Sequence, residues 1–355
     1  MSRIIPDRAS YATPSGLAVE TPPEERAYVV LQSARPPAQP DAVGVIDTNP
    51  TSASYGTLMS VMDGQSVPRR PDFAWHRAHD TLLTSEWDTS SIVRGGPNVE
   101  LLLAGKYGSR LQVWNARTRR QVNTIDLGIE QQLVLDLRAA HNPTRAFGFA
   151  STLISLADLS SSVFLWYLDR GNGGVAGEWK ARRIIGVPAE SAAPEALPPV
   201  LRHFEMVPPL ITHIDLSEDD RFLYVSCWGT GELRQYDVSD PFNPVLTGAA
   251  RLGGIVTRAP HPAAPLQPSS GGPQMLAVSR DGRRVYVANS LSAAWDARFY
   301  PAGLRGWVAK LDVGRAGGLT LDPRFLVEIE DGLCPHYLTL RNPHAPWPSS
   351  TRGRA

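Results

Sequence analysis

Residues 214–228 read IDLSEDDRFLYVSCW, and this stretch decides the fold class. β-Branched and aromatic residues stand on both sides of a short charged turn, a pattern that predicts two antiparallel strands joined by a hairpin. A third run of the same kind, residues 233–238, follows a glycine-rich corner at 229–231. Three consecutive strands with tight connections make up most of one propeller blade, so the stretch predicts an all-β propeller fold.

The same pattern returns as residues 275–290, MLAVSRDGRRVYVANS, followed by a further strand at 307–313. The pair Asp281-Gly282 is the strongest hairpin signal of the sequence, because both residue types tolerate the positive φ angles of a tight turn. Weaker copies are predicted at 73–87 and 135–149, and third strands of other blades at 43–47 and 111–115.

The predicted turns lie near residues 79, 143, 220 and 282, farther apart than the ~40 to 50 residues of a regular propeller repeat. Insertions account for the excess, and long loops are predicted at 186–199, 261–272 and 293–306. Such loops gather at the mouths of the central channel, where function is expected. A β-sandwich or a pair of small β domains is the alternative interpretation of the repeated strands.

The composition limits the partners of this chain. Lys plus Arg and Asp plus Glu both number 35, so no net charge attracts nucleic acid or acidic lipid. No apolar leader or membrane-spanning run occurs, and two cysteines are too few for a disulfide framework. The sequence predicts a cytoplasmic protein without nucleic-acid or membrane partners. It is expected to form a single propeller domain over 1–355, with an extended arm at 1–25 and a disordered tail at 338–355.

Several strings of this sequence are similar to motifs of the selenium-binding protein / methanethiol oxidase family. The first lies within the stretch quoted above, at 223–228, and continues as GELRQYDVSDP at 231–241. Others are GGPQM at 271–275, ANSLSAAWDARFYP at 288–301, TSEW at 84–87, YGS at 107–109, LQVW at 111–114, HNP at 141–143 and GGL at 317–319. The matches keep the family order from about residue 11, where YATP resembles the opening motif, to residue 327. The chain is identified as a shortened member of this family.

The resemblance implies a seven-bladed propeller, selenium binding in the animal members, and copper-dependent oxidation of methanethiol. In that reaction oxygen and water yield formaldehyde, hydrogen sulfide and hydrogen peroxide. The sequence departs from the family between Asp63 and Pro71, where relatives carry a paired-histidine motif, a Cys-Ser-Ser-Cys motif and a further histidine-bearing segment. Only residues 64–70 span that gap. We therefore expect an incomplete propeller of about five blades plus fragments, about two blades fewer than in the family.

A copper centre that holds a sulfur substrate and oxygen needs several imidazoles and an open coordination position. Among the 8 histidines, His336 and His141 are the candidate metal ligands. The resemblance places His336 near the closing Ala-His-Glu segment of the family. Cys227 is the candidate ligand for selenium or a thiol, and no catalytic residue is assigned. The structural alternatives are a turn-stabilising histidine at 141 and a buried strand thiol at 227.

The other histidines carry weaker signals. His76 and His79 stand three apart on a predicted hairpin, which is typical of a turn or a core imidazole, and His213 is predicted to be a satisfied, half-buried strand residue. Two functions remain open: a copper enzyme acting on a small sulfur compound, and a non-catalytic selenium-binding or protein-interaction propeller that has lost the metal site. A truncated reading frame is a third possibility, in which open strand edges would favour aggregation.

Overall fold

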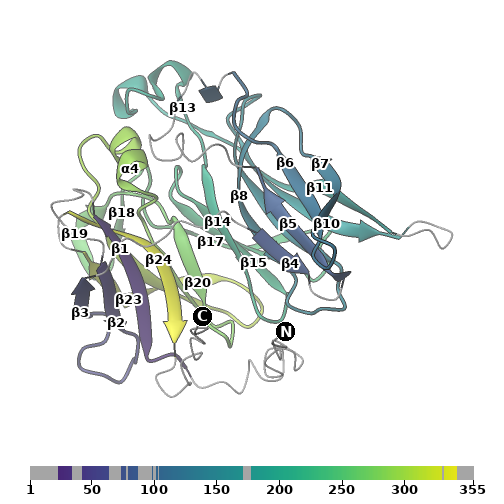
Figure 1. Ribbon diagram of the computed structural model, residues 1–355. Helices are drawn as coiled ribbons and strands as arrows, with labels where there is room; N and C mark the ends of the chain where they lie inside the picture. Colours follow the sequence, from purple (N-terminus) through teal and green to yellow (C-terminus); the bar gives the residue numbers. More distant parts are fainter. Residues whose placement is uncertain are drawn as a thin grey trace.

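The computed structural model describes residues 23–33, 42–63, 73–76, 79–86, 98, 101–102, 104–170, 177–329 and 332–341. Over these residues the chain is mostly β-structure, arranged as five four-stranded antiparallel sheets and two two-stranded ribbons (Figure 1). Each four-stranded sheet is one blade. The prediction of an all-β propeller with about five blades is confirmed.

The first blade joins the two ends of the described chain, because its inner strand comes from the C-terminal part. Its order is β24 (Leu333–Arg341), β1 (Arg26–Ser33), β2 (Ala42–Asp47) and β3 (Leu58–Asp63). The other four blades are each continuous in sequence. They consist of β4 (Phe73–His76), β5 (Thr81–Ser85), β6 (Arg110–Asn115) and β7 (Arg120–Asp126); β8 (Gln131–Ala139), β9 (Phe147–Ser155), β10 (Ser161–Asp169) and β11 (Glu178–Val187); β14 (Ile211–Leu216), β15 (Phe222–Cys227), β16 (Glu232–Asp237) and β17 (Val245–Arg251); and β20 (Met275–Val278), β21 (Arg284–Ala288), β22 (Trp307–Val313) and β23 (Leu319–Glu328).

The strands predicted from the charged-turn pattern are all present. The runs at 43–47 and 111–115 occupy the third positions of their blades, as β2 and β6. The three segments predicted as loops contain short elements instead: β12 (Glu190–Ser191) and η3 (Pro194–Ala196), β18 (Ala259–His261) and β19 (Ala264–Ser269), and α4 (Ala293–Phe299). η4 (Arg202–Phe204) and β13 (Met206–Val207) follow the first of these segments.

Two hairpins are built by the same short motif, Ser-x-Asp. In the β14–β15 turn the Ser217 hydroxyl donates to Asp219 at 2.6 Å and accepts the backbone N–H of Phe222 at 2.9 Å. In the β20–β21 turn Ser279 makes the same pair of bonds to Asp281 and Arg284, at 2.7 and 2.9 Å. The next residue, Asp220 or Gly282, has a φ of 56° or 67°, in the left-handed region that asparagine-type residues and glycine tolerate best. The charged turns are therefore structural.

Apolar side chains fill the spaces between successive blades. The inner strands lie side by side in the order β24, β20, β14, β8 and β4. Each of the four spaces between them holds a buried cluster that draws residues from both blades. Representative pairs that share a cluster are Val29 with Val308, Val287 with Tyr224, Val225 with Leu165, and Leu83 with Leu137. This burial is the main stabilising contribution to the arrangement.

The described residues show no buried cluster between the first blade and the β4–β7 blade. In Figure 1 these blades lie on opposite sides of the view, with β14 and β20 between them. Their inner strands carry half-exposed aromatic residues, Trp75 on β4 and Tyr337 on β24, each with 50% of its surface exposed. The ring is therefore packed at four blade interfaces within the described part of the chain. The predicted bridge at 64–70 lies outside the described residues.

The predicted arm and tail meet the fold at both ends of the described chain. Glu24, within the predicted arm, is 8% exposed, and its carboxylate accepts two hydrogen bonds from the Arg284 guanidinium at 2.6 and 2.9 Å. It also accepts the Tyr286 hydroxyl at 2.8 Å. At the other end β24 continues to Arg341, so the first four residues of the predicted tail form strand. The remainder of both segments lies outside the described residues.

Candidate functional site

One end of the propeller is covered by a cap. Strands β8, β14 and β20 begin at this end, which carries α4 and the β12–β13 ribbon (Figure 1). The segment from β12 to β14 and the helix α4 pack together in one apolar cluster, which includes Leu201, Leu210, Trp295 and Phe299. Trp228, the residue that follows β15, is fully buried beneath α4, and its ring meets those of Phe299 and Tyr300 edge-on at 5.4 and 5.2 Å. The cap is thus an extension of the core.

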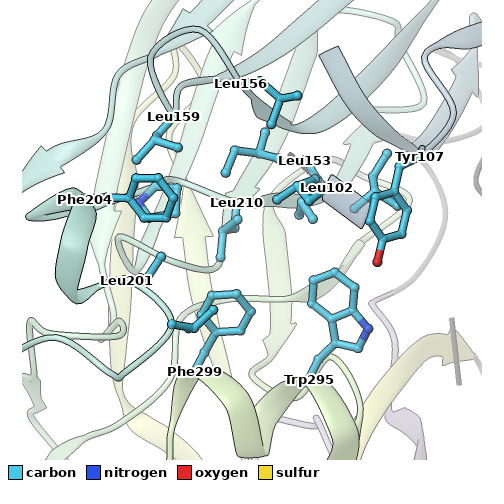
Figure 2. A pocket seen from close by; sticks show the side chains of 14 residues that line it. Leu102, Tyr107, Leu153, Leu156, Leu159, Leu201, Phe204, Leu210, Trp295 and Phe299 are labelled. Carbon is cyan, nitrogen blue, oxygen red and sulfur yellow. The ribbon is translucent and has the colours of Figure 1, made fainter. Parts of the chain in front are cut away.

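The cap encloses a cavity of about 70 Å³. Its 14 lining residues are shown in Figure 2, and 11 of them are leucine or aromatic. They are Leu102, Tyr107, Leu133, Leu153, Ile154, Leu156, Leu159, Val200, Leu201, Phe204, Pro208, Leu210, Trp295 and Phe299. A volume of this size is several times the ~10 to 15 Å³ that one water needs on the same measure. It suits an apolar molecule of a few heavy atoms.

Two aromatic rings of α4 form one wall of this cavity. Trp295 and Phe299 stand four residues apart, which places them on the same helical face, and their rings stack at a centroid distance of 6.2 Å. Opposite them, Tyr107 points its hydroxyl toward Trp295 (Figure 2). Tyr107 is fixed by two backbone bonds: its N–H donates to Gln132 Oε1 at 3.2 Å, and its hydroxyl accepts the Asn98 N–H at 3.1 Å.

A polar cluster lies on another side of α4. Asp296 is 5% exposed, and its carboxyl accepts the Ser290 hydroxyl at 2.5 Å and the Leu291 N–H at 3.1 Å. Burial raises the pKa of Asp296 to about 7, against the lowering effect of these hydrogen bonds. Burial, followed by the charge of Asp296, likewise raises the pKa of the Cys334 thiol to about 11. The acids of this cluster therefore favour their neutral forms.

The structure places the two predicted metal ligands at opposite ends of the blades. His141 lies in the β8–β9 turn, where its Nδ1 donates to Asp220 Oδ1 at 3.2 Å and its backbone N–H to the same oxygen at 2.7 Å. His336 lies on β24 near the cap, where its Nδ1 approaches the Ser290 carbonyl at 3.3 Å. Burial lowers the pKa of His141, but the hydrogen bond and charge of Asp220, with Glu218 and Asp215, outweigh burial and raise it. The contacts of His141 are those of a turn-stabilising residue.

Cys227, the predicted selenium or thiol ligand, ends strand β15 inside the core. Its side chain has no exposed surface and belongs to the cluster between the β8–β11 and β14–β17 blades. Burial raises its thiol pKa to about 12. Binding of selenium or a soft metal requires an accessible thiolate, and this environment opposes one.

Four further histidines of the described residues, His76, His79, His213 and His261, make contacts within the fold. The Nε2–H of His76 donates to the Arg145 carbonyl at 2.7 Å, and Nε2 of His213 accepts the Arg138 guanidinium at 2.7 Å. Nδ1 of His261 accepts the Ala263 N–H at 3.0 Å. His76 and His79 lie near each other, with ring centroids 4.9 Å apart.

Copper of the kind expected for the family does not fit the described residues. Across them, no three His, Cys, Asp or Glu side chains come close enough together to hold a metal ion. The donor set that copper prefers, several imidazoles around an open position, is limited here to the His76–His79 pair. We therefore derive no chemical step through copper.

Comparison with known proteins decides the family. The model of the family described as 56 kDa selenium binding protein matches residues 61–342, which is most of the chain. The chain belongs to this family. It is 37% identical to a methanethiol oxidase of Xenopus tropicalis over 285 residues, and 38% identical to a methanethiol oxidase of Homo sapiens over 284 residues. These alignments cover 75% of this chain and 57% and 56% of the two relatives. The chain thus spans little more than half the length of these relatives.

A solved structure supports the same assignment. The chain is similar to an X-ray structure described as a hypothetical selenium-binding protein from Sulfolobus tokodaii, with a TM-score of 0.83 and 30% sequence identity. The superposition covers 94% of this chain and 97% of the other. The selenium-binding protein assignment made from sequence motifs is therefore confirmed. Within the described ranges, no helix is long and apolar enough to cross a membrane.

The sequence prediction missed the cap and its cavity. Residues 293–306 were expected to form a loop, whereas α4 occupies Ala293–Phe299. Trp295 and Phe299 are separated by one helical turn, and this spacing is the signal that could have revealed the helix. The other walls come from residues far apart in the sequence, from Leu102 to Leu210, and no local pattern connects them.

Proposed function

We propose that this protein binds a small apolar thiol, methanethiol in the first instance, in the cap cavity and oxidises it as the name of its relatives implies. The proposed reaction is CH3SH + O2 + H2O → HCHO + H2S + H2O2. The observation that carries the proposal is the cavity itself, about 70 Å³ in volume and walled by Trp295, Phe299 and leucines. Methanethiol has two heavy atoms, and its transfer from water into such a cavity is favourable.

The cavity wall supplies specific contacts for a sulfur atom. A divalent sulfur about 5 Å from an aromatic ring gains ~0.3 to 1.5 kcal/mol, and the stacked rings of Trp295 and Phe299 offer such a surface. Leucine side chains on the opposite side would contact the methyl group and exclude water. The residues of this chain thus account for binding and desolvation of the thiol. Oxygen is the named electron acceptor of the proposed reaction.

The test measures all three products from purified full-length protein with methanethiol and oxygen, with and without added copper. We expect formaldehyde, hydrogen sulfide and hydrogen peroxide in equal amounts. The variant Leu201→Phe places a larger side chain in the cavity and should raise KM about tenfold, which corresponds to ~1.4 kcal/mol of lost binding. Leu266→Phe is the matched control, because Leu266 is 93% exposed. Unchanged KM in a folded Leu201→Phe protein would contradict the cavity as the binding site.

A second candidate function is a non-catalytic selenium-binding or thiol-binding module. One observation favours it: the described imidazoles of His141, His213 and His76 are engaged by Asp220, Arg138 and the Arg145 carbonyl rather than gathered around one point. Under this alternative, ethanethiol binds in the cavity and Leu201→Phe weakens its binding by the same factor of about ten. No product forms, whichever metal is added. Product formation at a steady rate over many turnovers would exclude it.

A further inference from the structure

Three leucines of the cavity wall have a backbone conformation that leucine rarely adopts. Seven non-glycine residues within the described ranges have a positive φ angle, and three of the seven are leucines. They are Leu133, Leu159 and Leu210, with φ angles of 62°, 58° and 51°, and all three line the cap cavity. The left-handed region is unfavourable for residues with a Cβ atom, and glycine, asparagine and aspartate are the types that adopt it routinely. Leucine therefore carries a backbone cost at each of these positions that glycine would not.

Backbone hydrogen bonds hold the three leucines in this conformation. The N–H of Leu133 donates to the Gly108 carbonyl at 3.0 Å, and the N–H of Leu159 donates at 2.9 Å within the turn that joins β9 and β10. The Leu210 carbonyl, directly before β14, accepts the Trp228 N–H at 3.1 Å. An unfavourable conformation persists when the surrounding structure determines it in this way. The fold thus fixes these backbones, and their side chains line the cavity.

The side chains of these leucines take up space in the cavity. Leu133 and Leu210 are 3% and 2% exposed, and Leu159 packs against the same apolar cluster, which also holds Trp295 and Phe299. In Figure 2 Leu159 stands on the side opposite the rings of α4. A leucine side chain consists of four carbon atoms, so glycine at one position would add room for about four heavy atoms. The present cavity, of about 70 Å³, has room for only a few.

We propose that Leu133, Leu159 and Leu210 are specificity-determining residues: their side chains restrict the cavity to short alkanethiols such as methanethiol and ethanethiol and exclude chains of about six carbons. Ethanethiol has three heavy atoms and 1-hexanethiol has seven, a difference equal to one leucine side chain. A longer chain could enter only by displacing wall residues whose backbones the fold holds in place. The proposal rests on the proposed function, because it names the thiols that the same cavity accepts.

Calorimetric titration of the full-length protein without oxygen gives the dissociation constants of ethanethiol and 1-hexanethiol. We expect the wild type to bind ethanethiol about tenfold or more tightly than 1-hexanethiol. In Leu210→Gly the ratio of the two constants should shift about tenfold or more in favour of 1-hexanethiol, since the longer chain buries more apolar surface once it fits. Arg119→Gly is the matched control. Arg119 has a φ of 58° in an exposed turn outside the cavity, so its variant relieves the same conformation and should keep the wild-type ratio.

Urea unfolding measures the backbone cost separately. Leu210→Gly and Leu210→Ala both remove most of the side chain, but only glycine also relieves the left-handed conformation. We therefore expect a higher urea midpoint for Leu210→Gly than for Leu210→Ala. The order should be reversed at Leu153, a wall residue of strand β9 whose φ angle is not positive, because glycine weakens an ordinary strand. The same order at both positions would overturn the assignment of these leucines.

Leu159→Gly repeats the titration if Leu210→Gly fails to fold, because Leu159 is less buried. An unchanged ratio in either folded glycine variant, or an equal shift in Arg119→Gly, would overturn the proposal, and so would tight binding of 1-hexanethiol to the wild type. Binding is measured without turnover. A shifted ratio in a protein that yields no product would therefore contradict the proposed oxidation and leave the specificity of the cavity standing. Product formation with an unchanged ratio would do the opposite.

Discussion

The two ends of the propeller are built on different principles. At the turn end, where β14 and β20 finish, polar side chains satisfy their own backbone: Ser217 and Ser279 bond the amides of their turns, and Asp220 bonds His141. At the cap end, aromatic rings enclose an apolar cavity beside the buried carboxyl of Asp296. Hydrogen bonds of this kind stabilise the hairpins of the turn end. The cap end differs from it in leaving apolar space unfilled, which is where we propose that the thiol binds.

The largest loss of stability is expected when the side chain of Trp228, in the core of the cap end, is removed. Trp228 is fully buried, packs on Phe299 and Tyr300, and donates its Nε1–H to the Asn289 carbonyl at 2.9 Å. Trp228→Ala should lower the free energy of unfolding by ~3 to 5 kcal/mol, since both the buried area and the hydrogen bond are lost. Urea unfolding of the wild type and the variant measures this loss of free energy. A loss below ~1 kcal/mol would contradict the description of the cap as part of the core.

At the turn end, removal of the Glu24 carboxylate should lower the free energy of unfolding nearly as much. Glu24→Ala leaves the Arg284 guanidinium, 17% exposed, without its bidentate partner and Tyr286 without its acceptor. We expect a loss of ~3 kcal/mol in urea unfolding. Glu328→Ala is the matched control, because the Arg305–Glu328 pair is about half exposed on both sides, at 56% and 50%, and should cost less than ~1 kcal/mol. Equal losses would show that burial of the Glu24 pair contributes nothing.

The two Ser-x-Asp turns offer an internal comparison within the turn end. Ser217→Ala and Ser279→Ala each remove an acceptor for two backbone amides, and each should cost ~1 kcal/mol. The double variant should cost the sum, because the turns belong to different blades. Strongly unequal costs in thermal or urea unfolding would show that the two motifs are not equivalent.

The smallest effect concerns the charge of His141. Its pKa is raised from 6.5 because Asp220 and nearby acids outweigh burial. Its stabilising contribution is therefore complete below the unfolded pKa and is lost as the pH rises through the folded one. NMR titration of the imidazole should give a pKa above that of free histidine, and Asp220→Asn should lower it. A wild-type pKa at or below the free value would contradict the ion pair.

The sequence predicted the turn end better than the cap end. The hairpins at 214–228 and 275–290 depend on local chemistry, Ser-x-Asp followed by Asp or Gly, and local chemistry is readable from one stretch. The family motifs likewise located strands of the blades. The cap depends on residues that are distant in sequence and share one apolar cluster, such as Leu210 and Trp295, and its helix α4 was predicted as a loop.

The candidate site residues likewise separate what the sequence can predict from what only the folded chain decides. The sequence leaves His141 open as a metal ligand or a turn residue, and its contacts with Asp220 are those of a turn residue. The sequence leaves Cys227 open as a ligand or a buried thiol, and the residue lies fully inside the core. Residue type and motif could raise these candidates, but burial and partners distinguish the alternatives, and both are properties of the folded chain.

The most direct test of the account is a crystal of the full-length protein exposed to methanethiol, with the sulfur located by anomalous scattering. We predict one sulfur peak inside the cap cavity, in contact with the rings of Trp295 and Phe299 and with Leu210, and a peak of clearly lower occupancy in the Leu201→Phe variant at the same methanethiol concentration near the wild-type KM. A cavity that stays empty at saturating methanethiol, or a sulfur peak bound elsewhere in both proteins, would contradict it.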